Sequence, residues 1–168
     1  MLLGYVLRLA ISSSFILAGI SKLFSFNEAK KFPEKIGLFQ GKLGRAMGGC
    51  MPFLELFLGI LSILYNNYLL NIFIFGVLLF FIVLNLKFTL EKKESKCFCY
   101  GKLIDTKIGK GGLVHYLYQF IIFLISVIIL KKESNINIIS EFFIIFILSF
   151  LIFINGMIIR RVIEKLNI

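Results

Sequence analysis

The stretch YLLNIFIFGVLLFFIVLNL, residues 68–86, decides the fold class of this chain. It runs for nineteen residues without a charged side chain. A helix needs about 20 mostly apolar residues to cross a hydrocarbon core of about 30 Å. The stretch therefore predicts a transmembrane helix. Its length and apolar composition are the criterion for the other spans.

Four further stretches meet the same standard, namely residues 2–20, 46–65, 113–130 and 142–159. The second of these is the weakest because Glu55 lies within it. The first has no basic residue before its apolar run and contains Arg8, so we predict a retained first span and not a cleaved signal peptide.

Composition supports the membrane interpretation. Hydrophobic residues make up 59% of the chain and the mean hydropathy is +0.95, whereas about half of a soluble domain is apolar. We expect the additional apolar residues to contact the lipid bilayer. We therefore predict an all-α integral membrane protein that forms a single membrane domain, residues 1–168, with a four-helix core and a fifth, C-terminal span.

The net charge of +10 would also suit a nucleic-acid-binding protein. The basic residues, however, lie mostly in short gaps between apolar runs and form no contiguous face. They are typical of flanking charges that fix topology and meet anionic headgroups. We expect no nucleic-acid partner.

Two long loops carry most of the basic residues. Residues 66 and 67 make a tight hairpin between the second and third spans, so the loops 21–45 and 91–112 must lie on one side of the membrane. We expect a short surface helix in the first loop. Sixteen Lys and Arg residues lie on that side, and only Lys131 and Lys132 lie on the other. This bias predicts that both loops and the C-terminal tail are cytoplasmic.

The second loop contains the sequence ESKCFCYGKLIDTKIGKGG, residues 94–112. A disulfide between Cys97 and Cys99 would close a small, strained ring, which suits exchange better than structural cross-linking. The lysines on either side of the pair favour the thiolate, and Gly101 lets the chain turn sharply. Cys50 lies at a similar depth on the same side. We therefore predict redox exchange by Cys97 and Cys99, with each other, with Cys50 or with a partner protein.

Two other interpretations of the cysteines stay open. They can be idle or structural thiols in a non-catalytic membrane scaffold, and a lone cysteine such as Cys50 is more often a small packing residue. Alternatively, the three thiols and His115 could form a zinc site, although their spacing is unlike that of paired CxxC ligands. We predict no metal.

Charged residues inside the spans need partners, because each costs a few kcal/mol on insertion scales. Arg8 and Lys22 fall on one stripe of the first span, and Glu55 is the natural counter-ion for either. We favour a role of this pair in helix packing; the alternative is a pocket for a quinone or a proton behind the cysteines. His115 and Gln119 share a helix face near the thiol loop, where the histidine could transfer a proton.

Four local patterns resemble the methylamine-utilisation MauE proteins, relatives of the DoxX membrane proteins. The first span reads RLAISSSFILAGISKLF, similar to an Arg, Ala-Gly, Lys pattern; the second reads MPFLELFLGIL, similar to a Pro and Glu pattern. The loop reads CFCYG where the family has Cys-x-Cys-Phe-Gly, and the order of the elements agrees. The resemblance covers residues 1 to 130. It departs at GLVHYLYQF. Family members often have an Arg-Asn pair at the start of this helix, and this chain has His115 and Tyr116 near that position instead.

The resemblance implies a DoxX/MauE-like bundle in the cell membrane (the bacterial inner membrane) and thiol–disulfide maturation of exported proteins beside a thioredoxin-like partner. Cys97, Cys99 and Cys50 are then the candidate catalytic residues, and Gly101, Arg8, Lys22, Glu55 and His115 support them. No residue set in the sequence demonstrates a quinone site. Maturation of exported proteins would place the cysteine loop outside, in conflict with the lysine bias, and the sequence leaves that conflict open.

Overall fold

The computed structural model describes residues 2–91, 95–97, 106–131 and 138–166, with side chains from residue 3 to 91, 109 to 130 and 144 to 166 except residue 145. Its helices are α1 (Leu2–Phe24), α2 (Phe26–Lys35), α3 (Gly41–Leu64), α4 (Tyr68–Leu90), α5 (Lys110–Lys131) and α6 (Ile138–Leu166). Two short strands, β1 (Ser95–Cys97) and β2 (Thr106–Ile108), lie between α4 and α5.

Five of the helices are long and apolar enough to cross a membrane, which confirms the prediction of an all-α integral membrane protein. Four of them contain the whole predicted stretch, and α3 contains all of 46–65 except its last residue. Each helix extends beyond its stretch by three to seven residues at one end or both. A helix of 23 residues such as α4 is about 35 Å long, slightly more than the hydrocarbon thickness. The additional turns therefore carry the helix ends into the headgroup region.

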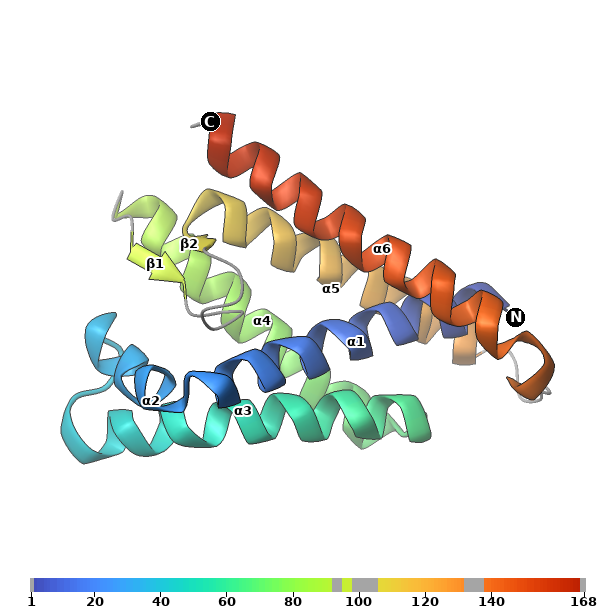
Figure 1. Cartoon of the computed structure of the whole chain (residues 1–168), viewed down its shortest axis with the longest axis horizontal. Coiled ribbons are helices and arrows are strands. Elements are labelled where there is room, and N and C mark those ends of the chain that lie inside the picture. The colour runs from blue at the N-terminus through green and yellow to red at the C-terminus, as the bar shows by residue number, and fades with distance from the viewer. Residues whose placement is uncertain (1, 92–94, 98–105, 132–137, 167–168) are drawn as a thin grey trace.

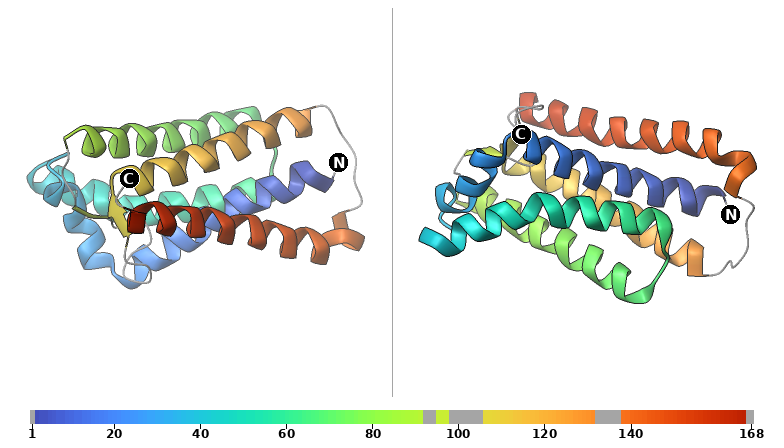
Figure 2. Two further views of the ribbon diagram at one scale, coloured as in Figure 1. Left: turned by 90° about the horizontal axis from the view of Figure 1, so that it is seen from above. Right: turned by 60° about the horizontal axis from the view of Figure 1, so that its bottom comes forward.

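The long helices alternate in direction, so the loops collect at two ends of the bundle (Figure 1). The short turn between α3 and α4 lies at one end, together with the N-terminus. Helix α2, the two strands and the C-terminal end of α6 lie at the other end, which we call the cysteine end. Figure 2 shows the same separation from two further directions. The described parts of the two large loops and of the tail therefore lie at one end of the bundle (Figure 1, Figure 2).

Helix α2 is the short helix expected in the first loop. It packs on α3 and contacts α1. Ala29 and Pro33 are its buried residues, and its lysines lie on the remaining faces. This amphipathic pattern places α2 across the cysteine end, with its apolar side against the bundle.

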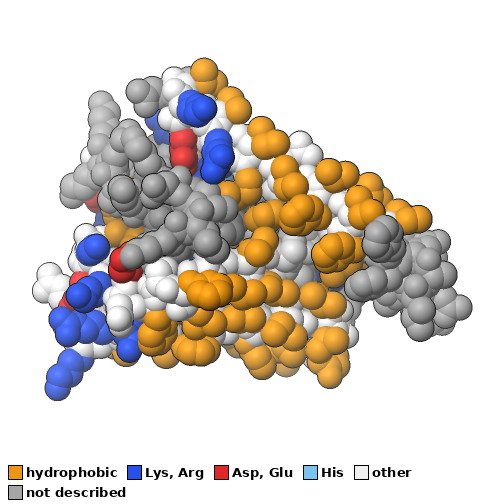
Figure 3. Space-filling view, in the orientation of Figure 1, with side chains coloured by type: hydrophobic (Ala, Val, Ile, Leu, Met, Phe, Trp, Pro, Cys, Tyr) orange, Lys and Arg blue, Asp and Glu red, His pale blue; other side chains and the backbone are white. Residues whose placement is uncertain are grey.

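The outer surface shows where lipid contacts the protein. Apolar side chains cover the middle of the bundle, and Lys and Arg gather toward the cysteine end (Figure 3). The largest exposed apolar side chains on α3 and α4 include Phe57 at 64% and Phe73 at 65%. Soluble monomers rarely expose a continuous apolar surface of this kind, so this surface is the one in contact with the bilayer.

Candidate functional site

The cysteine motif begins on a small antiparallel ribbon. Strands β1 and β2 pair with Cys97 opposite Thr106 and Ser95 opposite Ile108. The sequence did not predict this ribbon, because three-residue strands have too few residues to show an alternating pattern. Cys97 is the last residue of β1, and the structure describes its backbone. Cys99 and Gly101 lie outside the described residues. Their roles stay predictions.

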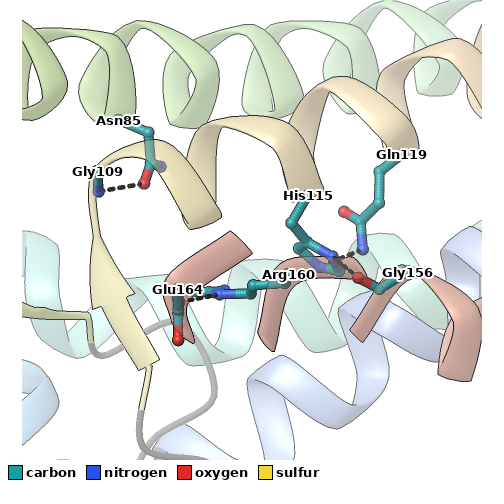
Figure 4. A network of polar contacts seen from close by, with 7 residues as sticks. All are labelled: Asn85, Gly109, His115, Gln119, Gly156, Arg160 and Glu164. Carbon is teal, nitrogen blue, oxygen red and sulfur yellow. Dashed lines mark hydrogen bonds and ion pairs between the residues drawn. The ribbon is translucent and has the colours of Figure 1, made fainter. Parts of the chain in front are cut away.

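Asn85 joins the ribbon to the bundle. Its side chain on α4 is only 1% exposed, and its Oδ1 accepts a hydrogen bond from the backbone N–H of Gly109, at 3.3 Å (Figure 4). Its Nδ2 donates to the carbonyl of Phe81 at 2.8 Å. Gly109 directly follows β2 and has φ of +128°, which favours glycine. Helix α4 thus holds the backbone at the point where the ribbon passes into α5.

A second glycine allows this contact. A Cβ added to Gly112 would collide with Oδ1 of Asn85, so the Asn85 side chain can hold this position beside the first turn of α5 only because residue 112 has no side chain. Two glycines and one asparagine therefore fix the position of the ribbon exit relative to two spans.

Cys50 is a free thiol on the exposed side of α3. Met47, Phe53 and Leu54, which lie three or four residues away along the helix, are exposed as well. The Cys50 side chain therefore belongs to the outer face of α3 near the cysteine end and is not part of the buried core. A contact between Cys50 and the CxC pair stays a prediction, because Cys99 and the side chain of Cys97 lie outside the described part of the chain.

Lys22 and Glu55 form a buried ion pair between α1 and α3. The exposed fractions of the two side chains are 7% and 2%. Glu55 was expected to neutralise either Arg8 or Lys22, and Lys22 is its partner. Within the described residues, Oε2 of Glu55 has no hydrogen-bond partner, so the carboxylate keeps a free acceptor in the interior.

Arg8 makes a different set of contacts, at the opposite end of the bundle. Its guanidinium donates four hydrogen bonds of 2.8 to 3.1 Å, to the carbonyls of Ser62 and Tyr65 and the side-chain oxygens of Asn66 and Asn71. The group therefore clamps the turn between α3 and α4 onto α1. Arg8 lies far from the cysteine end and holds the helices in place.

His115 and Gln119 lie on one face of α5, as predicted, and they contact each other. Nε2 of His115 accepts from the Gln119 side chain at 3.1 Å, and Gln119 also donates to the hydroxyl of Ser14 on α1. Nδ1 of His115 lies 3.3 Å from the carbonyl of Gly156 on α6 (Figure 4). A tautomer with the proton on Nδ1 satisfies both contacts.

This histidine network connects three spans. His115 is 1% exposed and its ring nitrogens face α6 and Gln119. No group of three His, Cys, Asp or Glu side chains among the described residues could hold a metal ion. Its contacts with Gly156 and Gln119 make the ring part of the packing between α1, α5 and α6.

Helix α6 contributes a buried cation that sequence analysis did not single out. Arg160 is completely buried, and its Nε donates to Glu164, one turn further on, at 2.9 Å. In the sequence, Arg160 counted only among the sixteen basic residues on one side of the membrane. Its spacing of four residues from Glu164 was the available signal, since such a pair can neutralise a cation within one helix.

An apolar cavity lies at the cysteine end, between α2, α3 and α4. It contains about 660 Å³ of empty space, including its open mouth. Lys22 and Asn85 contribute to its wall, so the buried ion pair and the anchor of the ribbon border one cavity. Its remaining lining is apolar: Ala29, Phe32, Pro33, Ile36, Leu38, Phe39, Met47, Gly48, Met51, Phe80, Phe81 and Leu84.

The comparison with protein families agrees with this arrangement. The sequence model of the family described as methylamine utilisation protein MauE matches residues 1–131. The chain belongs to the MauE family. The match covers α1 to α5, including the cavity, the Lys22–Glu55 pair and the cysteine ribbon, and it ends before α6. No curated protein and no solved structure matches the chain. The likeness to DoxX proteins stays a prediction.

Sequence reasoning missed Asn85 as the residue that holds the MauE-family cysteine loop. A polar residue in an otherwise apolar span is the signal that could have identified it, because such residues are costly in lipid and are usually buried with a partner. Ser14 and Ser62 were missed for another reason. Serine is common in spans, and its hydroxyl can satisfy itself on its own helix, as that of Ser12 does on Arg8.

Proposed function

We propose that this chain is a thiol–disulfide redox component of the cell membrane. In this proposal Cys97 and Cys99 exchange disulfides with a thiol-containing partner protein of the thioredoxin type. Membership of the MauE family supports the membrane setting, and the attachment of the cysteine ribbon to α4 through Asn85 is the observation on which the proposal depends. Attachment to α4 keeps the backbone of Cys97 at one depth at the end of the bundle, which favours access by a partner from the adjacent aqueous phase.

The exchange needs only thiols and disulfides. The thiolate of one cysteine attacks a sulfur of the partner disulfide, forms a mixed disulfide and releases one partner thiolate. The second cysteine then attacks the mixed disulfide, which leaves an oxidised Cys97–Cys99 pair and a reduced partner. The reverse sequence oxidises the partner. Flanking lysines favour the thiolate form in either direction.

The test is to trap the intermediate. In Cys97→Ser or Cys99→Ser, the remaining thiol has no neighbour to resolve the mixed disulfide, so a covalent partner should accumulate and be visible on non-reducing gels. Cys50→Ser tests the third candidate thiol, and the triple serine variant is the background control. If neither single variant traps a defined partner under oxidising or reducing conditions, the chain is a non-catalytic membrane scaffold.

The side of the membrane can be measured on the same protein. The C-terminal end of α6 lies at the cysteine end (Figure 1), so a compartment-sensitive reporter fused to the C-terminus reports on the cysteine ribbon too. A signal from outside the cytoplasm supports maturation of exported proteins. A cytoplasmic signal restricts the exchange to cytoplasmic partners, where persistent disulfides are unusual.

A further inference from the structure

We propose that the apolar cavity between α2, α3 and α4 binds the ring of a membrane-soluble quinone, with Lys22 donating a hydrogen bond to a ring carbonyl. This inference rests on the proposed redox function, because it names the electron acceptor for that function. It also makes a separate claim about binding, which can be tested without any thiol chemistry.

The mouth of the cavity faces the bilayer. Helix α3 packs mainly on α1 and α2 and touches α4 much less, although only a short turn connects α3 to α4. Met47 on α3 and Phe80 on α4 line the cavity and are exposed at 41% and 38%. Both belong to the apolar outer surface, so the cavity is reached between the two helices from the lipid phase. A ligand that enters here must be soluble in the membrane.

The lining suits a flat, uncharged ring. Phe32, Phe39, Phe80 and Phe81 supply aromatic surface, and Nζ of Lys22 lies 5.5 Å from the centroid of the Phe81 ring. An ammonium group has three N–H donors, and the bond to Glu55 uses one. A carbonyl oxygen in the cavity can accept another.

Charge decides between a quinone and an anionic lipid. Lys22 and Glu55 together carry no net charge, so a phosphate or a fatty-acid carboxylate would bring an unbalanced negative charge into an apolar cavity, which is costly. A quinone offers carbonyl acceptors and brings no charge. Its isoprenoid tail can leave through the mouth between α3 and α4.

Asn85 connects the cavity to the residue that follows the cysteine ribbon. Asn85 lines the cavity and accepts the hydrogen bond of Gly109, and Cys97 lies opposite Thr106, three residues before Gly109. The reaction balances without another reagent. Two thiols lose two electrons and two protons to become a disulfide, and the quinone takes up both electrons and both protons to become a quinol.

Direct binding measurements test the proposal. The full chain, in lipid nanodiscs with its thiols reduced and alkylated, is dialysed to equilibrium against decylubiquinone as the probe. We expect saturable binding. Leu84→Trp fills the cavity from α4 and Ala29→Leu narrows it from α2, and each should raise Kd at least about tenfold, the equivalent of about 1.4 kcal/mol. Leu79→Trp is the matched control because Leu79 is 44% exposed on the same helix, and its Kd should stay at the native value.

Three outcomes are decisive. If Leu84→Trp and Ala29→Leu fold, as judged by helical circular dichroism, and bind the quinone as the native chain does, the proposal is wrong. It is also wrong if native mass spectrometry finds a phospholipid in the native cavity that decylubiquinone does not displace. If the cavity variants lose binding but Cys97→Ser and Cys99→Ser trap no partner, the quinone site stands and the proposed thiol exchange fails.

Discussion

Asn85 accepts a hydrogen bond from the backbone N–H of Gly109 although 24 residues separate them in sequence. The bond links the third span to the residue that directly follows the cysteine ribbon. Both groups are buried, so no water can replace the lost partner when the bond breaks. The bond therefore couples the position of the ribbon to the packing of α4 and α5.

Replacing Asn85 with leucine should loosen the ribbon. Leucine has a similar size but no acceptor, and an unsatisfied buried N–H costs at least about 1 kcal/mol. We expect the open population of the ribbon to rise about fivefold, and alkylation of Cys97 and Cys99 to accelerate accordingly. The measurement is the alkylation rate by mass spectrometry in a Cys50→Ser background. Asn155→Leu is the control, because Asn155 is exposed and bonds only to its own helix. Equal rates in both variants would contradict the coupling.

Breaking the Lys22–Glu55 pair from one side should destabilise the bundle. Lys22→Met leaves the Glu55 carboxylate buried without its cation, which costs about 3–5 kcal/mol. The double variant Lys22→Met, Glu55→Met removes both charges and should recover most of that loss, because neither charge then remains in the interior. The free energy of unfolding in mixed detergent micelles measures both effects. Additive losses in the double variant would mean that the two side chains are not coupled.

Arg8 should tolerate lysine poorly. The planar guanidinium reaches four acceptors at once, and a lysine ammonium cannot reproduce that fork. We expect Arg8→Lys to lose about 1 kcal/mol of unfolding free energy, since the buried carbonyl of Ser62 and the partly buried acceptors in and beside the turn lose donors. Asn71→Ala removes one acceptor and should cost less. Protease cleavage at the turn should increase in Arg8→Lys, and an intact turn with native stability would show that the clamp contributes nothing.

The spans could be read from the sequence because each depends on local composition. Hydropathy alone placed all five, and the need of a buried charge for a partner identified Glu55 as a counter-ion. The choice between Arg8 and Lys22 was beyond the sequence. The four acceptors of Arg8 lie in and beside the α3–α4 turn, and two of them, on Tyr65 and Asn66, come from a turn whose geometry only the folded chain defines.

The cysteine ribbon and the histidine network show the same limit more clearly. Strand β1 finds its partner across the intervening loop, and neither strand has enough residues to reveal a period. The contact of His115 with Gly156 joins two spans, and the two residues are 41 positions apart in the sequence. Such contacts depend on how helices are rotated against each other, and an almost uniformly apolar span such as α4 gives little indication of its rotation.

Glycine substitutions should separate packing from helix propensity. A Cβ on Gly19 would lie 2.8 Å from the Pro52 carbonyl oxygen, and one on Gly59 would lie 2.7 Å from Ile16. Gly19→Ala and Gly59→Ala should therefore push α1 and α3 apart and cost about 1–3 kcal/mol each. A Cβ on Gly76 has no neighbour within 4 Å among the described residues, so Gly76→Ala should be neutral or gain up to about 1 kcal/mol from its better helix propensity. Thermal unfolding of the three variants measures the difference. Equal stability of all three variants would contradict the close approach of these helices.

The same variants should differ in quinone binding. The packing of α1 on α3 also holds the Lys22–Glu55 pair beside the cavity. Gly19→Ala should therefore weaken quinone binding, whereas Gly76→Ala should leave it unchanged.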